Sequence, residues 1–257
     1  MIDRGFLYRR LARIFPVHFP NVACGGITLA NKHQLASFSE VFLNPHYWRL
    51  MDLLPGPPKT IVHLGGNCGF FPVLCEIVVR STFGDCAAEY HVFEAVEAMT
   101  RNIILAARQA NIERRTSVVH GVVGKRSGQA MFASGPKSLL DSSAAFQDDR
   151  RRLRQRVDYI DLEKYLHDHG VDHVDVLKVD IEGSEYDLIE TFPELFKKVA
   201  LVFMELHDVR GDGSQLCKAR QFFKNSGLIL IEPVLHNGPH ELLVLSNVRG
   251  GDSRSGS

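Results

Sequence analysis

Apolar runs and amphipathic stretches alternate along the chain from about residue 60 onward. Short, continuous apolar runs predict buried strands at 60–66, 89–95, 116–124, 129–133, 174–183 and 199–207. Apolar positions that recur every three or four residues predict helices at 71–81, 96–111, 161–170 and 184–196. Strands that are apolar on both faces are typical of a parallel sheet covered by helices on both sides. The pattern therefore predicts a doubly wound α/β sandwich.

The last third of the chain adds a helix and a hairpin to this series. Residues 216–227 predict a helix, and residues 228–233 and 240–247 predict two strands that form an antiparallel hairpin at one edge of the sheet. The stretch 134–161 has few apolar and many small or charged residues, so we expect an exposed loop there. Loops at that edge of an α/β sheet are where substrates are selected.

The beginning and the end of the chain lie outside the alternation. Residues 1–58 lack it and end in a proline-rich turn, so we expect a helical lid or an extra layer. The domain proper then covers residues 59–248. Residues 249–257 are small, polar and glycine-rich, which predicts a disordered tail.

The charge balance bears on the class of partner. The 257 residues include 30 Lys and Arg and 30 Asp and Glu, so no overall field attracts a polyanion. We therefore expect no nucleic-acid partner, and we interpret the basic run at 150–156 as a solvated loop rather than an anion site. The sequence does not indicate an oligomeric state.

The cysteines and the apolar runs bear on the compartment. The 5 cysteines are odd in number and scattered, without a Cys-x-x-Cys pair, which argues against a disulfide framework or a zinc knuckle. No apolar run approaches the roughly 20 residues of a membrane span, and the N-terminus lacks the apolar core of a signal peptide. We expect a soluble, cytoplasmic protein with no integral membrane segment.

A glycine turn follows the first predicted strand. Gly65, Gly66 and Gly69 do not have the Gly-x-Gly-x-x-Gly spacing of a dinucleotide fingerprint. They nevertheless bring bare backbone and a helix N-terminus to the carboxyl edge of the sheet, where nucleotides bind, although a tight turn alone would also explain them. Glu94 ends the second predicted strand, at about the sequence separation from the turn where a carboxylate reaches ribose hydroxyls in such folds. The alternative interpretation of Glu94 is a solvated residue at a strand end.

Acids gather after the strand at 174–183. Asp180, Glu182 and Glu185 lie within six residues of one another, and such crowding calls for a cation, a proton or a hydroxyl among them. Helix capping by Ser184 or Asp180 explains part of the pattern. One strand later, Glu205 and His207 lie on the same side by period-two alternation, so His207 is a candidate proton acceptor or an ordinary polar residue.

Four blocks of the sequence, taken in order, carry a family resemblance. VHLGGNCGFF, FEAVEAMTRN, LKVDIEGSE and MELH resemble the signature blocks of the FkbM-type S-adenosylmethionine-dependent methyltransferases, over residues from about Phe38 to Val248. The resemblance implies the Rossmann-like class I methyltransferase fold, a mostly parallel seven-stranded sheet with a C-terminal antiparallel hairpin. It also implies methyl transfer to a hydroxyl oxygen, with a saccharide or another small molecule such as a secondary metabolite as acceptor.

The resemblance also implies site residues. It places the cofactor at His63, Gly65, Gly66, Asn67, Gly69, Glu94, Asn102, Asp180 and Glu182, with Gly183 and Glu185 completing the acidic block. His63 departs from the family pattern, which has an aspartate there, and a neutral imidazole supplies hydrogen bonds but no charge. An S-adenosylmethionine-binding protein with impaired catalysis is therefore an alternative function, and a dinucleotide oxidoreductase is disfavoured by the glycine spacing.

The predicted chemistry is alignment of an acceptor oxygen with a sulfonium methyl group and removal of the hydroxyl proton. Asp180 and His207 are the candidate catalytic residues. A divalent cation held by Asp180, Glu205 and His207 would be another way to activate the hydroxyl. The sequence does not choose between a base and a metal.

Overall fold

The protein, described here by a computed structural model, is built around one large sheet. The structure describes residues 16–19, 26–85, 87–134, 153–231, 235–237 and 240–247. The strand order is β10-β12-β9-β8-β3-β4-β5, with β11 paired to β12. The bounds are β3 (Thr60–Leu64), β4 (Glu89–Glu94), β5 (Thr116–His120), β8 (Val174–Val179), β9 (Val199–His207), β10 (Ile229–Leu230), β11 (Leu235–Asn237) and β12 (His240–Ser246).

The directions of the strands confirm the predicted fold class. Five strands, β3, β4, β5, β8 and β9, run parallel to one another. β12 runs antiparallel to β9, β10 and β11. β12 is inserted between β9 and β10, so the C-terminal hairpin does not simply extend the edge. The chain order reverses at β3, which has β4 on one side and β8 on the other. Such a switch point opens a crevice at the carboxyl ends of the strands, where α/β proteins bind ligands.

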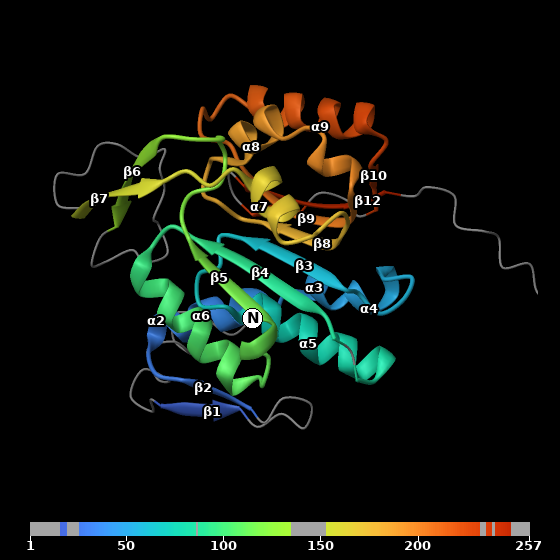
Figure 1. Cartoon of the computed structure of the whole chain (residues 1–257). Helices are drawn as coiled ribbons and strands as arrows, with labels where there is room; N and C mark the ends of the chain where they lie inside the picture. Colours follow the sequence, from blue (N-terminus) through green and yellow to red (C-terminus); the bar gives the residue numbers. More distant parts are fainter. Residues whose placement is uncertain are drawn as a thin grey trace, which may run out of the picture.

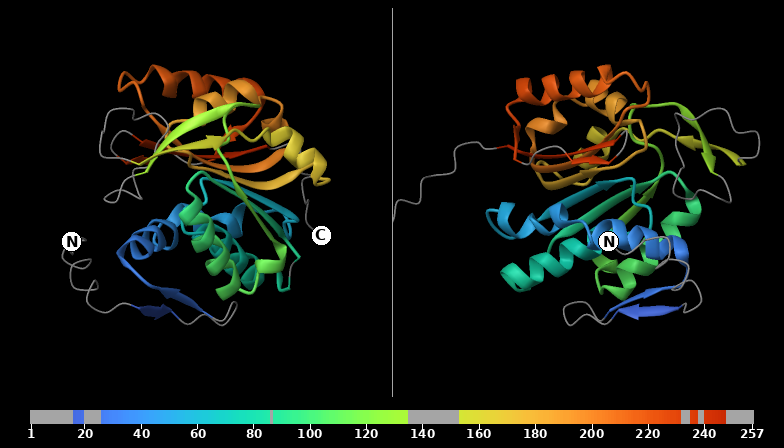
Figure 2. Two further views of the ribbon diagram at one scale, coloured as in Figure 1. Left: turned by 60° about the vertical axis from the view of Figure 1, so that its left-hand side comes forward. Right: turned by 180° about the vertical axis from the view of Figure 1, so that it is seen from behind.

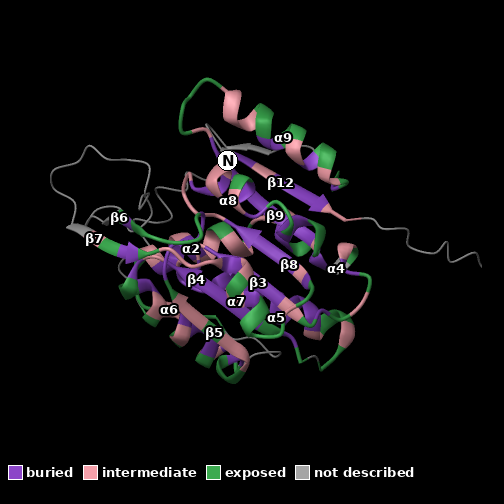
Figure 3. Ribbon diagram, turned by 45° about the horizontal axis from the view of Figure 1, so that its top comes forward, coloured by how far each residue is buried: buried purple, intermediate pink, exposed green. Residues whose placement is uncertain are grey.

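Helices cover both faces of the sheet (Figures 1 and 2). One face carries α2 (Lys32–Phe42), α3 (Pro45–Trp48), α4 (Leu50–Leu53), α5 (Phe70–Phe83) and α6 (Glu97–Gln109). The other carries α7 (Leu162–Asp168), α8 (Glu185–Thr191) and α9 (Ser214–Ser226). Short 3-10 helices, Glu113–Arg115 and Leu195–Lys197, precede β5 and β9. Burial is concentrated along the central strands, as the purple colouring in Figure 3 shows.

The N-terminal residues form an extra layer on the sheet. The ring of Tyr47 in α3 packs against Phe71 and Phe203, with centroids 5.4 and 5.6 Å away, so this layer shares the core of the sheet. The helices of the layer agree with the sequence pattern, while the division at residue 58 stays a prediction. The pattern missed the hairpin of β1 (Val17–Phe19) and β2 (Ile27–Leu29) because three-residue strands are too short for alternation to register.

The region predicted as a loop at 134–161 is partly a strand. β7 (Leu153–Asp158) pairs antiparallel with β6 (Gln129–Ser134) in a separate two-stranded sheet. The sequence pattern hid β7 because the ribbon is only half-buried and arginine alternates with other residues along it. Residues 135–152, which hold the first part of the basic run, and the tail at 249–257 lie outside the described residues. Among the helices of the described ranges, none has the length and apolar character needed to cross a membrane.

Candidate active site

The glycine turn after β3 is tied to both neighbouring strands. The backbone N–H groups of Gly65 and Gly66 donate to the carbonyl of Phe93, at 3.0 and 2.9 Å, and Asp180 N–H donates to Leu64 at 3.0 Å. Gly65 has a φ of +85°, and a Cβ placed on it would lie 1.7 Å from the carbonyl oxygen of Asp180. Only glycine fits this position, since the backbone that directly follows β8 occupies the space of a side chain.

The other glycines of the turn have a different role. A Cβ on Gly66 would lie 2.6 Å from side-chain atoms of Ile103 and Val92, and one on Gly69 would lie 2.8 Å from Ile103 Cα. These glycines therefore allow α6 to pack closely against the turn. Of the turn residues, Gly65 and Asn67 line the pocket, whereas Gly66 and Gly69 support the turn from behind. A direct role of Gly66 and Gly69 at the cofactor stays a prediction.

A pocket of about 670 Å³ opens beyond the carboxyl ends of β3, β4, β5 and β8. Its lining residues are Gly65, Asn67, Phe93, Glu94, Ala95, Met99, Gly121, Val122, Val123, Asp180, Ile181, Glu182 and Ser184. The pocket lies at the switch point of the sheet, where the strand order places a ligand.

Glu94 is a fixed acceptor in the wall of this pocket. Its carboxylate accepts the N–H of Asn67 at 2.7 Å and the N–H of Val96 at 2.8 Å, one on each oxygen. Burial raises the pKa of Glu94 to about 7, against the lowering effect of the backbone N–H groups. Each oxygen keeps a further lone pair, so the side chain can accept bonds from two neighbouring hydroxyls.

His63 lies behind the turn rather than in the pocket. Its register partner on β8 is Lys178, and its ring lies 5.3 Å from that of Phe71. The side chain is buried, and its Nδ1 has no hydrogen-bond partner among the described residues. Burial first, and then the charge of Lys178, lower the pKa of His63 well below its usual value. A neutral His63 adds no charge to the site, which is the expectation from its replacing the aspartate of the family pattern.

Lys178, which is buried, and Asp180, which is half-buried, form an ion pair beside the turn. The Nζ of Lys178 lies 2.9 Å from Asp180 Oδ2 and 5.5 Å from the ring centroid of Tyr47. Burial alone would raise the pKa of Asp180, but the charge of Lys178 lowers it. Asp180 is therefore an ionised carboxylate that already has a cationic partner.

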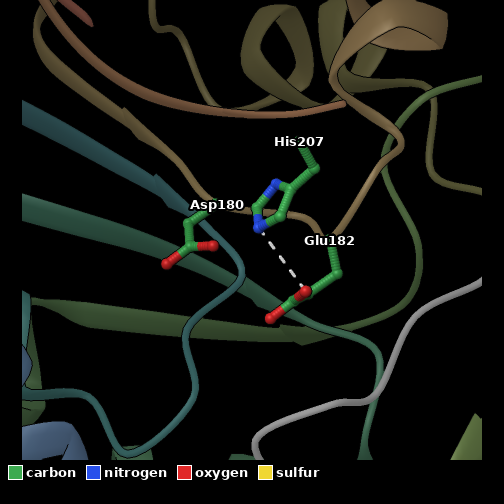
Figure 4. A group of neighbouring side chains, drawn as sticks. All are labelled: Asp180, Glu182 and His207. Atoms are coloured by element: carbon green, nitrogen blue, oxygen red, sulfur yellow. Dashed lines mark ion pairs between the residues drawn. The ribbon is translucent and has the colours of Figure 1, made fainter. Parts of the chain in front are cut away.

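Two carboxylates, of Glu182 and Glu185, flank the imidazole of His207, and Figure 4 shows Glu182 together with Asp180 beside the ring. His207 Nδ1 lies 3.0 Å from Glu185 Oε1, and Nε2 lies 3.5 Å from Glu182 Oε2. Asp180, Glu182 and His207 each present one ligand atom within 4.8 Å of the others, so these three could hold a cation. The cation site expected from the sequence has Glu205 as its third ligand, in place of Glu182. Glu205 faces the Lys178 pair, and burial followed by the charge of Asp180 raises its pKa.

The Glu182 and His207 side chains bind protons more tightly than usual. Burial, together with the charge of Asp180, raises the pKa of Glu182 to about 8. Burial would lower the pKa of His207, but the hydrogen bond and charge of Glu185 raise it to about 9. The pair therefore titrates above neutral pH, and not near the ordinary value of 6.5 for a histidine.

Two predicted roles, those of Asn102 and Ser184, do not appear as contacts in the structure. Asn102 lies on α6, where its Oδ1 is 3.5 Å from Gln34 Nε2 of α2. It is not among the residues that line the pocket, so its role at the cofactor stays a prediction. Ser184 is the N-cap residue of α8, but its side chain makes no capping hydrogen bond. Capping by Ser184 therefore does not explain the acidic block.

One wall of the pocket does not follow from the sequence pattern. Gly121, Val122 and Val123 line it, whereas the apolar run at 116–124 predicts one continuous strand. β5 ends at His120, and the next three residues turn toward the pocket. A glycine inside an apolar run was the available signal, because it often marks the end of regular pairing.

Comparison with known proteins gives a family. A sequence model described as Methyltransferase FkbM domain matches residues 75–230, and no curated protein matches the chain significantly. Aeropyrum pernix fibrillarin, solved with natively bound S-adenosyl-L-methionine, is similar at 12% identity over 90% of this chain and 82% of that chain, with a TM-score of 0.46. M. capricolum TrmK, solved with S-adenosyl-homocysteine, is similar at 7% identity over 80% and 69%, with a TM-score of 0.42.

The family match contains most of the pocket. It begins after the glycine turn and includes Glu94, Asp180, Glu182 and His207. At TM-scores below 0.5 the solved structures add no argument, and the description of the fold rests on the strand order and directions given above. Since the matched residues make up more than half of the sequence, the chain belongs to the FkbM family of methyltransferases.

Proposed function

We propose that this protein is an S-adenosylmethionine-dependent O-methyltransferase that acts on a hydroxyl of a sugar or secondary metabolite. The observation that carries the proposal is a pocket whose lining includes the fixed carboxylate of Glu94 together with Asp180 and Glu182, with His207 beside it at 3.5 Å from Glu182. Glu94 suits a ribose diol, and the cluster of Asp180, Glu182 and His207 suits the proton of an acceptor. Membership in a methyltransferase family supports this assignment.

The pocket residues fit the cofactor in three parts. Phe93, Met99 and the 121–123 segment give apolar walls for the adenine, and Glu94 has free lone pairs for the ribose hydroxyls. The bare backbone at Gly65 allows the methionine part to approach the turn. When bound, S-adenosylmethionine supplies a methyl group on a sulfonium, which is an excellent leaving group.

The chain then has two tasks, alignment of the hydroxyl and removal of its proton. We assign the second to the Glu182 and His207 pair, whose Oε2 and Nε2 atoms lie 3.5 Å apart. With the methyl group supplied by bound S-adenosylmethionine, the Glu182 and His207 side chains would accept the proton that the acceptor hydroxyl loses. Asp180, held by Lys178, supports the developing positive charge on the pair.

Replacing Glu94 with alanine is expected to weaken S-adenosylmethionine binding by about 2 to 3 kcal/mol, roughly 30- to 150-fold in Kd, because charge-assisted hydrogen bonds are lost. Isothermal titration calorimetry with S-adenosylmethionine measures the change. Glu89→Ala, at the exposed start of the same strand, is the matched control and should bind as the wild type does. An unchanged Kd in Glu94→Ala would remove Glu94 from the ribose site.

Removal of divalent cations is expected to leave methyl transfer intact. Lys178 already neutralises Asp180, His207 is ion-paired with Glu185, and a pKa of about 8 keeps Glu182 protonated at neutral pH, so the cluster needs no metal ion to balance its charges. The measurement is methyl transfer from labelled S-adenosylmethionine to a panel of sugars and hydroxylated secondary metabolites, before and after treatment with EDTA. Loss of product with EDTA and its return with Mg²⁺ or Mn²⁺ would replace the base by a metal.

Two finer points belong to this proposal. Calorimetric binding of S-adenosylmethionine without any methylated product from the panel would favour the alternative of a binding protein with impaired catalysis, for which neutral His63 is the supporting feature. We also propose the cytoplasm as the compartment. Cys68, Cys75 and Cys217 are free thiols in the structure, which suits a reducing environment.

A further inference from the structure

Glu185 is a buried carboxylate that the proposed chemistry has not used. It is the first residue of α8, and its side chain is 0% exposed. An acid in the first turn of a helix is ordinarily explained by the helix dipole. Here the carboxylate turns back toward the chain that precedes the helix, so the dipole does not account for its position.

Four contacts of 3.0 to 3.1 Å define the surroundings of this carboxylate. Oε1 accepts the backbone N–H groups of Ile181 and Gly183 at 3.1 Å, and Oε2 accepts that of Gly183 at 3.0 Å. Oε1 also lies 3.0 Å from His207 Nδ1. Because the two backbone groups are obligatory donors, Glu185 must be an acceptor toward them, and an ionised carboxylate is an acceptor toward His207 as well.

The tautomer of His207 follows from these contacts. Nδ1 must carry a hydrogen in order to donate to Glu185, so a His207 ring that has lost one proton has lost it from Nε2. Nε2 is the ring nitrogen that faces Glu182 and Asp180 in Figure 4, where the dashed line joins it to Glu182. The nitrogen that exchanges the proton is therefore the one on the side of the pocket.

The Glu185 carboxylate also binds the backbone of the segment that forms one wall of the cofactor pocket. Ile181, Glu182 and Ser184 line the pocket, and Glu185 holds the N–H groups of residues 181 and 183 in this segment. Glu182 has a φ of +52°, an unusual backbone conformation that directs its side chain toward His207. One buried group thus joins the pocket wall, Glu182 and His207.

We propose that Glu185 is a positioning residue: it fixes the Nδ1–H tautomer and the direction of the His207 ring, so that Nε2 and Glu182 meet the hydroxyl proton of the acceptor. The proposal rests on the proposed function for the identity of that proton. It adds a role that a helix-capping or dipole explanation of Glu185 does not include.

The variant Glu185→Ala tests this role, with Glu190→Ala as the matched control on the exposed side of the same helix. Alanine removes the carboxylate that accepts from Nδ1, so a neutral His207 ring is no longer held as the Nδ1–H tautomer. Long-range ¹H–¹⁵N spectra of the protein bound to S-adenosylhomocysteine, recorded above the pH at which the ring becomes neutral, report the tautomer. The signal of His207 is assigned by its absence in His207→Gln.

We expect the Nδ1–H pattern for His207 in the wild type and in Glu190→Ala, and its loss in Glu185→Ala. An Nε2–H pattern in the wild type, or an unchanged pattern in Glu185→Ala, would overturn the proposal. This readout needs no acceptor, so it is separate from the test of the proposed function. Failure of the wild type to methylate any compound of the panel would contradict that function without changing the spectra.

Turnover in a double-mutant cycle gives the second readout. Glu185→Ala should lower methyl transfer roughly 100-fold or more, and the same substitution in a His207→Gln background should have little further effect, because a positioning residue acts through its partner. Binding of S-adenosylhomocysteine is the control for damage to the pocket wall. Equal losses in both backgrounds would show a general structural role and overturn the proposal.

Discussion

The variant Gly65→Ala is expected to lose S-adenosylmethionine binding and to be destabilised by about 3 to 5 kcal/mol. Two costs combine at this position. The backbone has a φ of +85°, where an L side chain is strained, and the added Cβ would lie 1.7 Å from the backbone oxygen of Asp180. Because that oxygen belongs to the segment after a central strand, relief requires β3 and β8 to move apart at the pocket.

Thermal unfolding and calorimetry with S-adenosylmethionine measure the two effects. For a chain of this size, the loss of stability corresponds to a decrease in Tm of roughly 10 °C. Gly56→Ala is the control, since a Cβ there has nothing within 4 Å and the backbone needs no positive φ. A Gly65→Ala protein with the Tm and affinity of the wild type would mean that the turn is not packed against β8 as described.

The variant His207→Ala is expected to lower methyl transfer by roughly 100-fold or more while cofactor affinity stays near that of the wild type. His207 is the partner of Glu182 in accepting the hydroxyl proton, and it is not among the residues that line the cofactor pocket. Initial rates with the acceptor that the wild type methylates best, together with calorimetry, separate the two quantities. Wild-type turnover in His207→Ala would exclude the pair as proton acceptor.

The pH dependence of turnover in the wild type tests the same assignment of Glu182 and His207 as proton acceptors. With pKa values of about 8 for Glu182 and about 9 for His207, both groups hold protons at neutral pH and neither can accept another. We therefore expect turnover to rise with pH across this interval, as the pair loses its first proton. A rate that is flat from about pH 6 to 9.5, or that falls above pH 8, would contradict the assignment.

The sequence was informative where chemistry follows regular structure. Continuous apolar runs gave the central strands, and the residues at their carboxyl ends, Glu94, Asp180 and His207, meet at one edge because parallel strands bring their ends together. The sequence also predicts Gly65 as a turn glycine, but its packing against the backbone of Asp180 does not follow from the sequence. These predictions needed only strand period and direction.

Other parts depended on packing that a sequence pattern does not contain. The bond of Glu185 to His207 joins residues on different elements, and a first-turn acid resembles many others in sequence. Gly66 and Gly69 make room for Ile103, which no local pattern indicates. The strand β7 was missed because a half-exposed two-stranded ribbon lacks the apolar run of a core strand.

The most direct test of the central claim is a crystal structure of the protein with S-adenosylhomocysteine. We expect the ligand in the pocket at the carboxyl ends of β3, β4 and β5, with its ribose hydroxyls within hydrogen-bond distance of Glu94 and its sulfur directed toward Glu182 and His207. A ligand bound elsewhere, or one whose ribose does not touch Glu94 at saturating concentration, would contradict the claim that this pocket is the methyl-transfer site.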